Sequence, residues 1–224
     1  MHPGALIRAT GAERRNVETW LWLSEPVQLI LVRHALPLRS EESADPPLAE
    51  LGHQQAARIP DALARFGVAR TVASTQLRAL QTGTSLAADR GLRLDSDERL
   101  TEYDRDFGGY IPIEDARTEF ADAFARIKDG HLPEQVDEVA FRTRVLEGIA
   151  AAVDGVEHTD TVAVFAHGGV INIVLQDILT TPKVLGFPID YCSITRILYS
   201  RNGKRSVASI NETQHVWDLL PRNR

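Results

Sequence analysis

The stretch VQLILV at residues 27–32 is a short, mainly apolar run that ends abruptly at Arg33 and His34. Its length and its aliphatic, partly β-branched composition are typical of a strand buried on both faces of a parallel sheet. A second stretch, TVAVFA at residues 161–166, ends in the same way at His167. The two stretches predict two buried parallel strands, each followed at its carboxyl end by a histidine.

The segments around these strands predict an α/β domain. Apolar residues at helical spacing alternate with further short apolar runs, and Pro60 is expected to kink or split the first helix. Ser74 is expected to cap the second helix. The expected helices are residues 48–66, 75–89, 113–129, 136–153 and 170–179, and the expected further strands are residues 70–73, 92–94, 193–199 and 206–211. Strands that alternate with helices predict a three-layer α/β/α sandwich, with a mostly parallel sheet flanked by helices.

The domain organisation is expected to be simple. Residues 1–25 are interpreted as an N-terminal appendage, and residues 26–224 as one domain, a size that allows a well-filled core. No apolar run has the length of a membrane helix or of a signal-peptide core, so the expected location is cytoplasmic. Cys192 is the single cysteine, which excludes an internal disulfide and suits a reducing compartment.

The charge balance restricts the class of partner. A formal net charge of −6 argues against a broad nucleic-acid surface, which needs clustered Lys and Arg. It does not exclude a small anionic substrate, because a few buried arginines can set the local field. No membrane partner is expected, and the edge of the hairpin at residues 193–211 could support a homodimer.

Positively charged and imidazole side chains collect at one expected edge of the sheet. In open α/β sheets, ligands bind outside the carboxyl ends of the strands, where Arg33, His34 and His167 are expected. Arg78 falls in the first turn of a helix, an end that favours anions, so a bound phosphate would resolve the misfit. Taken singly, each feature has a structural explanation: a histidine after a strand is usually structural, and an arginine can pair with a carboxylate. Together they predict an anion site.

Several motifs in this order and spacing resemble the signatures of the histidine phosphatase superfamily, the phosphoglycerate-mutase-like proteins. The resemblance covers residues 27 to about 217. The motifs are VRH at residues 32–34, LAELGHQQA at 48–56, STQLRALQT at 74–82, LTE at 100–102, FAHGG at 165–169, CSIT at 192–195, and His215.

The resemblance implies a metal-independent phosphomonoester hydrolase that needs no cofactor and acts on a phosphorylated small molecule. It implies that His34 attacks phosphorus and becomes a phosphohistidine, while Arg33, Arg78 and His167 hold the phosphoryl oxygens. Glu102 is implied as the general acid and base. Its neighbours Glu98, Asp104 and Asp106 remain alternatives for that role, and they are otherwise expected to form a solvated acidic loop.

The sequence departs from the family pattern beside His34. Ala35 replaces the usual glycine, and apolar residues at 36–38 replace polar ones, which predicts a more apolar mouth for the site and leaves the substrate class open. Tyr191 stands where a small polar residue is usual, and a packing role is expected for it.

Three functions stay open at this stage. The first is the phosphatase. The second is a phosphoglycerate-type mutase, which would interconvert isomers without releasing phosphate. The third is a non-catalytic phosphate-binding module of the same fold. The short segment between Glu102 and the helix expected at 136–153 favours hydrolysis, because a longer insertion would be needed to exclude water.

Overall fold

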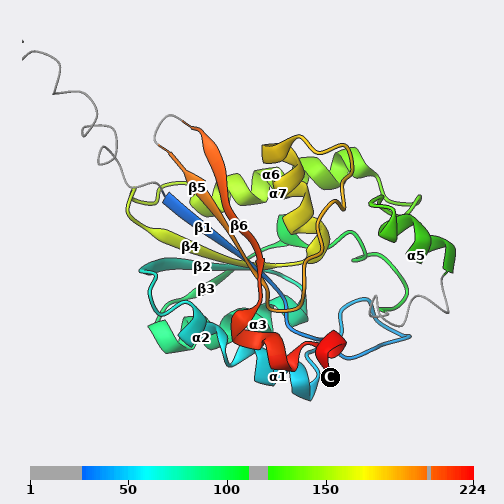
Figure 1. Ribbon diagram of the computed structural model, residues 1–224, viewed down its shortest axis with the longest axis horizontal. Coiled ribbons are helices and arrows are strands. Elements are labelled where there is room, and N and C mark those ends of the chain that lie inside the picture. The colour runs from blue at the N-terminus through cyan, green and yellow to red at the C-terminus, as the bar shows by residue number, and fades with distance from the viewer. Residues whose placement is uncertain (1–26, 111–120, 201–202) are drawn as a thin grey trace, which may run out of the picture.

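A six-stranded sheet with the strand order β3-β2-β4-β1-β5-β6 forms the centre of the molecule (Figure 1). The computed structural model describes residues 27–110, 121–200 and 203–224, so the predicted appendage lies outside the described residues. Four strands, β1 to β4, are parallel to one another, β5 is antiparallel to β1, and β6 is antiparallel to β5. The strands are β1 (Val27–Arg33), β2 (Val68–Ser74), β3 (Leu94–Asp97), β4 (Thr161–Ala166), β5 (Ile194–Tyr199) and β6 (Arg205–Glu212).

Helices cover both faces of this sheet, as Figure 1 shows. Along β1 the side chains alternate between two cores: Leu29 and Leu31 pack towards α6 and α7, while Ile30 and Val32 pack towards α1, α2 and α3. The helices are α1 (Glu50–Ala56), α2 (Ile59–Ala62), α3 (Leu77–Arg90), α5 (Ala121–Lys128), α6 (Glu138–Val153) and α7 (Gly168–Leu179), with 3₁₀ turns at Glu98–Leu100, Gln214–Leu219 and Pro221–Asn223. The predicted three-layer sandwich with a mostly parallel sheet is confirmed.

Two predicted elements have different bounds. The helix expected at 48–66 is divided into α1 and α2, with Pro60 in the first turn of α2, where a missing backbone N–H costs nothing. The strand expected at 92–94 begins later, as β3 at Leu94. Gly91 ends α3 in the left-handed conformation at φ 63°, and the chain turns there before it can pair with another strand. Of the helix expected at 113–129, only α5 lies within the described residues. The hairpin is confirmed, but part of its turn lies outside them.

The predicted capping role of Ser74 is wrong. Ser74 ends β2, and the residue that precedes α3 is Gln76. The first free N–H of the helix, at Leu77, is instead bound by the carboxylate of Asp45 at 2.7 Å. The Ser74 hydroxyl accepts a hydrogen bond from the N–H of Gln76 at 3.3 Å and also contacts the site described below. None of the helices in the described ranges is long and apolar enough to cross a lipid bilayer.

The segment after β1 is fixed by close packing against α1. The carbonyl of Leu36 accepts a hydrogen bond from the N–H of Ala49 at 3.0 Å, which draws the two backbones together. A Cβ atom added at Gly52 would lie 2.1 Å from that carbonyl oxygen. Glycine is therefore required at position 52 to hold the segment that follows His34.

We expect Gly52→Ala to lower the free energy of unfolding by about 2–3 kcal/mol, because the added methyl meets rigid backbone. Urea unfolding measures the change. Gly67→Ala is the matched control: no atom lies within 4 Å of its added Cβ, and the change should stay within about 0.5 kcal/mol. Equal stability of the two variants would contradict the packing argument.

Candidate active site

The parallel pairing of β1 with β4 brings the two predicted histidines together. The register sets Arg33 opposite Ala166, so the residues that follow each strand are neighbours. The N–H of His34 donates to the carbonyl of Ala166 at 2.9 Å, and the ring centroids of His34 and His167 are 5.1 Å apart. One phosphate group can therefore contact both imidazoles.

The ring of His34 presents one nitrogen to the cavity. Its Nδ1 lies 2.7 Å from the carbonyl oxygen of Ala35, which can only accept, so Nδ1 carries the proton and Nε2 keeps its lone pair. The side chain is buried, and burial, followed by the charges of Arg78 and Arg33, holds its pKa well below the usual range. His34 is thus a neutral imidazole at neutral pH. Burial is the larger of these causes.

The segment that carries His34 is held by side chains from two helices. The N–H of Ala35 donates to the hydroxyl of Thr82 at 2.9 Å, and the N–H of Leu36 donates to the Gln55 amide oxygen at 2.9 Å. Thr82 and Gln55 are fully buried members of two of the predicted motifs. These motifs therefore position the loop behind the nucleophile candidate.

His167 is fully buried between β4 and α7. Its Nε2 lies 2.8 Å from the hydroxyl of Ser74, while its Nδ1 has no hydrogen-bond partner among the described residues. Burial, then the charges of Arg78 and His34, holds the pKa of His167 well below its usual value. Ser74 was predicted as a helix cap. Its place at the end of β2, the strand next to β4, explains the contact.

Arg78 is a completely buried cation. Its Nη1 donates to the carbonyl of Ala44 at 2.8 Å, its Nη2 donates to both carboxylate oxygens of Asp104 at 3.0 and 3.2 Å, and its guanidinium lies 4.7 Å from the centre of the Tyr110 ring. Its Nε has no hydrogen-bond partner within the described residues. A buried donor of this kind is suited to an anionic ligand.

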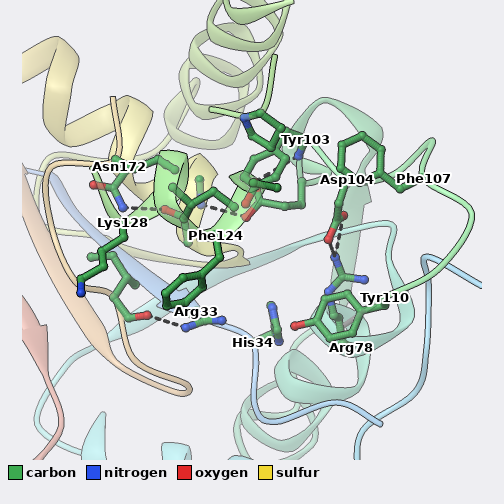
Figure 2. Close-up of a pocket in the computed structure, with 18 of the residues that line it drawn as sticks. Arg33, His34, Arg78, Tyr103, Asp104, Phe107, Tyr110, Phe124, Lys128 and Asn172 are labelled. Carbon is green, nitrogen blue, oxygen red and sulfur yellow. Dashed lines mark hydrogen bonds and ion pairs between the residues drawn. The ribbon is translucent and has the colours of Figure 1, made fainter. Parts of the chain in front are cut away.

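Arg33 reaches the same place from the end of β1 (Figure 2). Its Nη1 donates to the carbonyl of Ile189 at 2.6 Å, and its guanidinium lies 4.0 Å from the centre of the Tyr191 ring. Tyr191 is buried, and its ring centroid is 5.7 Å from that of His34. The expected packing role of Tyr191 is therefore incomplete, because the ring also supports Arg33 beside the site.

Glu102 is a buried carboxyl group that lines the same cavity as His34. Its Oε2 accepts from the N–H of Gly169 at 2.8 Å, and its Oε1 accepts from the N–H of Tyr103 at 3.1 Å. Its own N–H is held by the amide oxygen of Gln76 at 2.8 Å. Burial, followed by the negative charge of Asp104, raises the pKa of Glu102 to about 7. The group can therefore exchange a proton near neutral pH.

The close approach of Glu102 explains the glycine at the start of α7. A Cβ atom at Gly169 would lie 2.3 Å from Oε1 of Glu102. Free N–H groups at the start of a helix favour an anion. In the structure, one of them binds the carboxyl group instead.

The other three acidic candidates are placed differently. Asp104 binds Arg78 and is only 15% exposed, so its expected place in a solvated loop is wrong. Asp106 is exposed beside Arg105, and Glu98 is exposed at the start of a 3₁₀ turn. Glu102 is thus the buried carboxyl group of the four. The only sign in the sequence that Asp104 belongs to the site is its position two residues after Glu102.

Arg144 was missed by the sequence reasoning. From α6 its guanidinium donates to the carbonyls of Arg99 and Thr101 at 2.9 and 2.6 Å, and to that of Glu102 at 3.0 Å. These bonds fix the backbone that carries the acid. No short motif marks Arg144, because its partners are main-chain atoms distant in sequence.

The cluster opens into a cavity of about 1130 Å³. Within residues 27–110, 121–200 and 203–224, no group of three or more His, Cys, Asp and Glu side chains is arranged to hold a metal ion. The absence of any metal requirement remains a prediction.

These features define an α/β protein with a largely buried cluster of two histidines, two arginines and a carboxyl group that is suited to an anion. A profile of the histidine phosphatase superfamily (branch 1) matches residues 29–213. The chain belongs to this superfamily, and its function is of the phosphatase or mutase type. The predicted resemblance is confirmed.

Solved structures share the fold. The YhfR protein of Bacillus stearothermophilus is similar over 85% of this chain and 99% of its own, at 26% identity and a TM-score of 0.72. A mycobacterial glucosyl-3-phosphoglycerate phosphatase, in complex with VO3, is similar over 83% and 99%, at 22% identity and a TM-score of 0.66. A phosphoserine phosphatase of Entamoeba histolytica, in complex with 3-phosphoglyceric acid, is similar over 85% and 99%, at 19% identity and a TM-score of 0.66. A search of curated proteins finds no match.

We expect Arg78→Lys to weaken the binding of orthovanadate by about tenfold to a hundredfold, because an ammonium cannot reproduce the planar fork of a guanidinium. Isothermal titration calorimetry measures the affinity. Arg58→Lys is the matched control, since Arg58 forms a forked ion pair with Asp218 on the surface, away from the cavity. Unchanged affinity in Arg78→Lys would show that the anion binds elsewhere.

Proposed function

We propose that the protein is a phosphatase that hydrolyses a phosphomonoester through a covalent phosphohistidine on His34. The observation that carries this proposal is the geometry of His34: its Nδ1 lies 2.7 Å from the Ala35 carbonyl, which leaves Nε2 as the free nitrogen, and its ring centroid lies 5.1 Å from that of His167. A neutral imidazole is the nucleophilic form, and fixed positive donors favour the transfer of a phosphoryl group.

In the first step, Nε2 of His34 forms a bond to phosphorus as the ester P–O bond breaks. Glu102 gives its proton to the departing oxygen, which leaves as the alcohol. In the second step, Glu102, now a carboxylate, takes a proton from water while the water oxygen bonds to phosphorus. The P–N bond breaks, phosphate is released, and both residues return to their starting forms.

Arg33, Arg78 and His167 would hold the phosphoryl oxygens in both steps. Two guanidinium groups in a buried setting stabilise charge more than they would in water. Ser74 accounts for one nitrogen of His167, and the orientation of that ring is thereby fixed. Since Ser74 engages Nε2 of His167, this residue would contact the substrate through Nδ1.

Hydrolysis is preferred to the mutase alternative because only residues 103–137 separate Glu102 from α6. The names of two structural neighbours, a glucosyl-3-phosphoglycerate phosphatase and a phosphoserine phosphatase, favour the same choice. The chain also retains a nucleophile, an acid and a second histidine for these steps, at His34, Glu102 and His167. Their presence argues against a non-catalytic phosphate-binding module.

The intermediate can be trapped. We expect rapid quenching with ³²P-labelled p-nitrophenyl phosphate to give a labelled protein whose label is lost in acid and retained in base, as for a phosphoramidate. His34→Ala should give no labelled protein, while the exposed histidine variant His53→Ala should be labelled like the parent. A folded His34→Ala protein that still carries the label would end the proposal.

The pH profile should depend on the leaving group. Because the pKa of Glu102 is raised to about 7, its protonated form is present below that pH and is lost as the pH rises through it. We therefore expect kcat/KM for butyl phosphate to fall between pH 7 and 9. For p-nitrophenyl phosphate, whose leaving group needs no proton, it should fall much less.

Glu102→Gln should lower kcat/KM for butyl phosphate by about 10²- to 10⁴-fold, and for p-nitrophenyl phosphate far less, because an amide cannot supply the proton. The exposed residue Glu98 provides the control, and Glu98→Gln should leave both values unchanged. Equal losses on the two esters in Glu102→Gln would assign the acid role to another group.

A further inference from the structure

The cavity above the phosphate site is much larger than a phosphate needs. Its volume of about 1130 Å³ exceeds the roughly 300–1,000 Å³ that is usual for pockets that enclose drug-sized ligands. Arg33, His34 and Arg78 form only its floor (Figure 2). Most of the volume is therefore available to the alcohol portion of an ester.

The walls of the cavity are largely aromatic and aliphatic. They come from three separate segments: the residues after Glu102, helix α5, and the loop after α7. All of the following wall side chains are only partly buried, so apolar surface faces the cavity: Tyr103, Phe107, Phe124, Ile127, Leu185 and Phe187. A ligand that covers such surface gains the free energy of removing it from water.

Two segments supply most of the aromatic surface of these walls. Phe124 and Ile127 are three residues apart on α5, so they share one face of the helix. Figure 2 shows that Phe124 reaches from α5 into the cavity on the side of Arg33. On another wall, Tyr103 packs edge-on against the buried ring of Phe141, with the centroids 5.9 Å apart.

Two polar side chains of the walls, Asn172 and Asp190, are engaged with other parts of the protein. The Asn172 amide donates to two carbonyls and accepts from the N–H of Phe187 at 2.9 Å. Asp190 is bound by Asn211 at 2.8 Å and by Arg222 at 2.9 Å. These two side chains therefore have less hydrogen-bonding capacity left for the hydroxyl groups of a sugar. Lys128, an exposed cation on α5, is the feature that would favour a carboxylate-bearing substrate instead.

We propose that the preferred substrate is a phosphomonoester of a bulky, mainly apolar or aromatic alcohol, whose body packs against Phe107 and Phe124 while its phosphate lies on the floor of the cavity. This inference rests on the proposed phosphatase function. To that function it adds the class of alcohol and the residues that select this alcohol.

A series of n-alkyl phosphates from ethyl to octyl tests the inference, because the leaving-group chemistry stays nearly constant while the apolar surface grows. We expect kcat/KM to rise about two- to fourfold for each added methylene until the cavity is filled. Hexyl phosphate should exceed glucose 6-phosphate and 3-phosphoglycerate, which are of comparable size, by at least about tenfold.

Substitutions identify which cavity wall binds the alkyl chain. Phe124→Ala should lower kcat/KM for octyl phosphate by about tenfold to a hundredfold, and that for ethyl phosphate by a much smaller factor. The control is Leu179→Ala, which removes a 41% exposed apolar side chain outside the cavity and should change neither value. Lys128→Ala should leave the preference for long chains intact.

A flat alkyl series would overturn the inference. So would a preference for 3-phosphoglycerate that disappears in Lys128→Ala, since that result would identify a carboxylate subsite. In both cases trapping of the phosphohistidine would still support the phosphatase. If no ester is hydrolysed and no labelled protein forms, the proposed function fails, and this inference fails with it.

Discussion

The parallel, in-register pairing of β1 with β4 is the constraint on which the site depends. It places Ala166 opposite Arg33, and so the next residue of each strand, His167 and His34, on the same edge of the sheet. Both strands are buried on both faces, so a shift in register would expose one core or the other. The hydrophobic core therefore fixes how far apart the backbones of the two histidines lie, while Ser74 and the Ala35 carbonyl orient the two rings.

The second constraint is electrostatic. Arg78 is completely buried, and an isolated buried guanidinium would be costly, so Asp104 and the Ala44 carbonyl compensate it. The same buried charges also affect the pKa values of the two histidines and of Glu102. The arginines help to keep both histidines neutral, while burial and Asp104 keep Glu102 able to hold a proton near pH 7. A site that is positive at its floor can thus exist in a chain with a net charge of −6.

Supporting residues come from segments far apart in the sequence. Gln55 and Thr82 hold the loop after His34, Gln76 holds the N–H of Glu102, and Arg144 binds the carbonyls on either side of it. Each makes a hydrogen bond to main-chain atoms. Such contacts leave no pattern that periodicity can detect, which is why the roles of Gln76 and Arg144 were not foreseen, although Gln55 and Thr82 were recognised as motif residues.

The sequence by itself determined the fold class, the buried strands and the identity of the residues at their carboxyl ends. It could do so because burial on both faces requires unbroken apolar runs, and because parallel strands deliver their last residues to one edge. Only the tertiary structure decided that Ser74 contacts His167, that Asp104 binds Arg78, and that the apolar cavity walls come from residues after Glu102, from α5 and from the loop after α7, and not from residues 36–38. Those relations join side chains whose spacing in the chain is arbitrary, and they are fixed only when strand order and loop packing are complete.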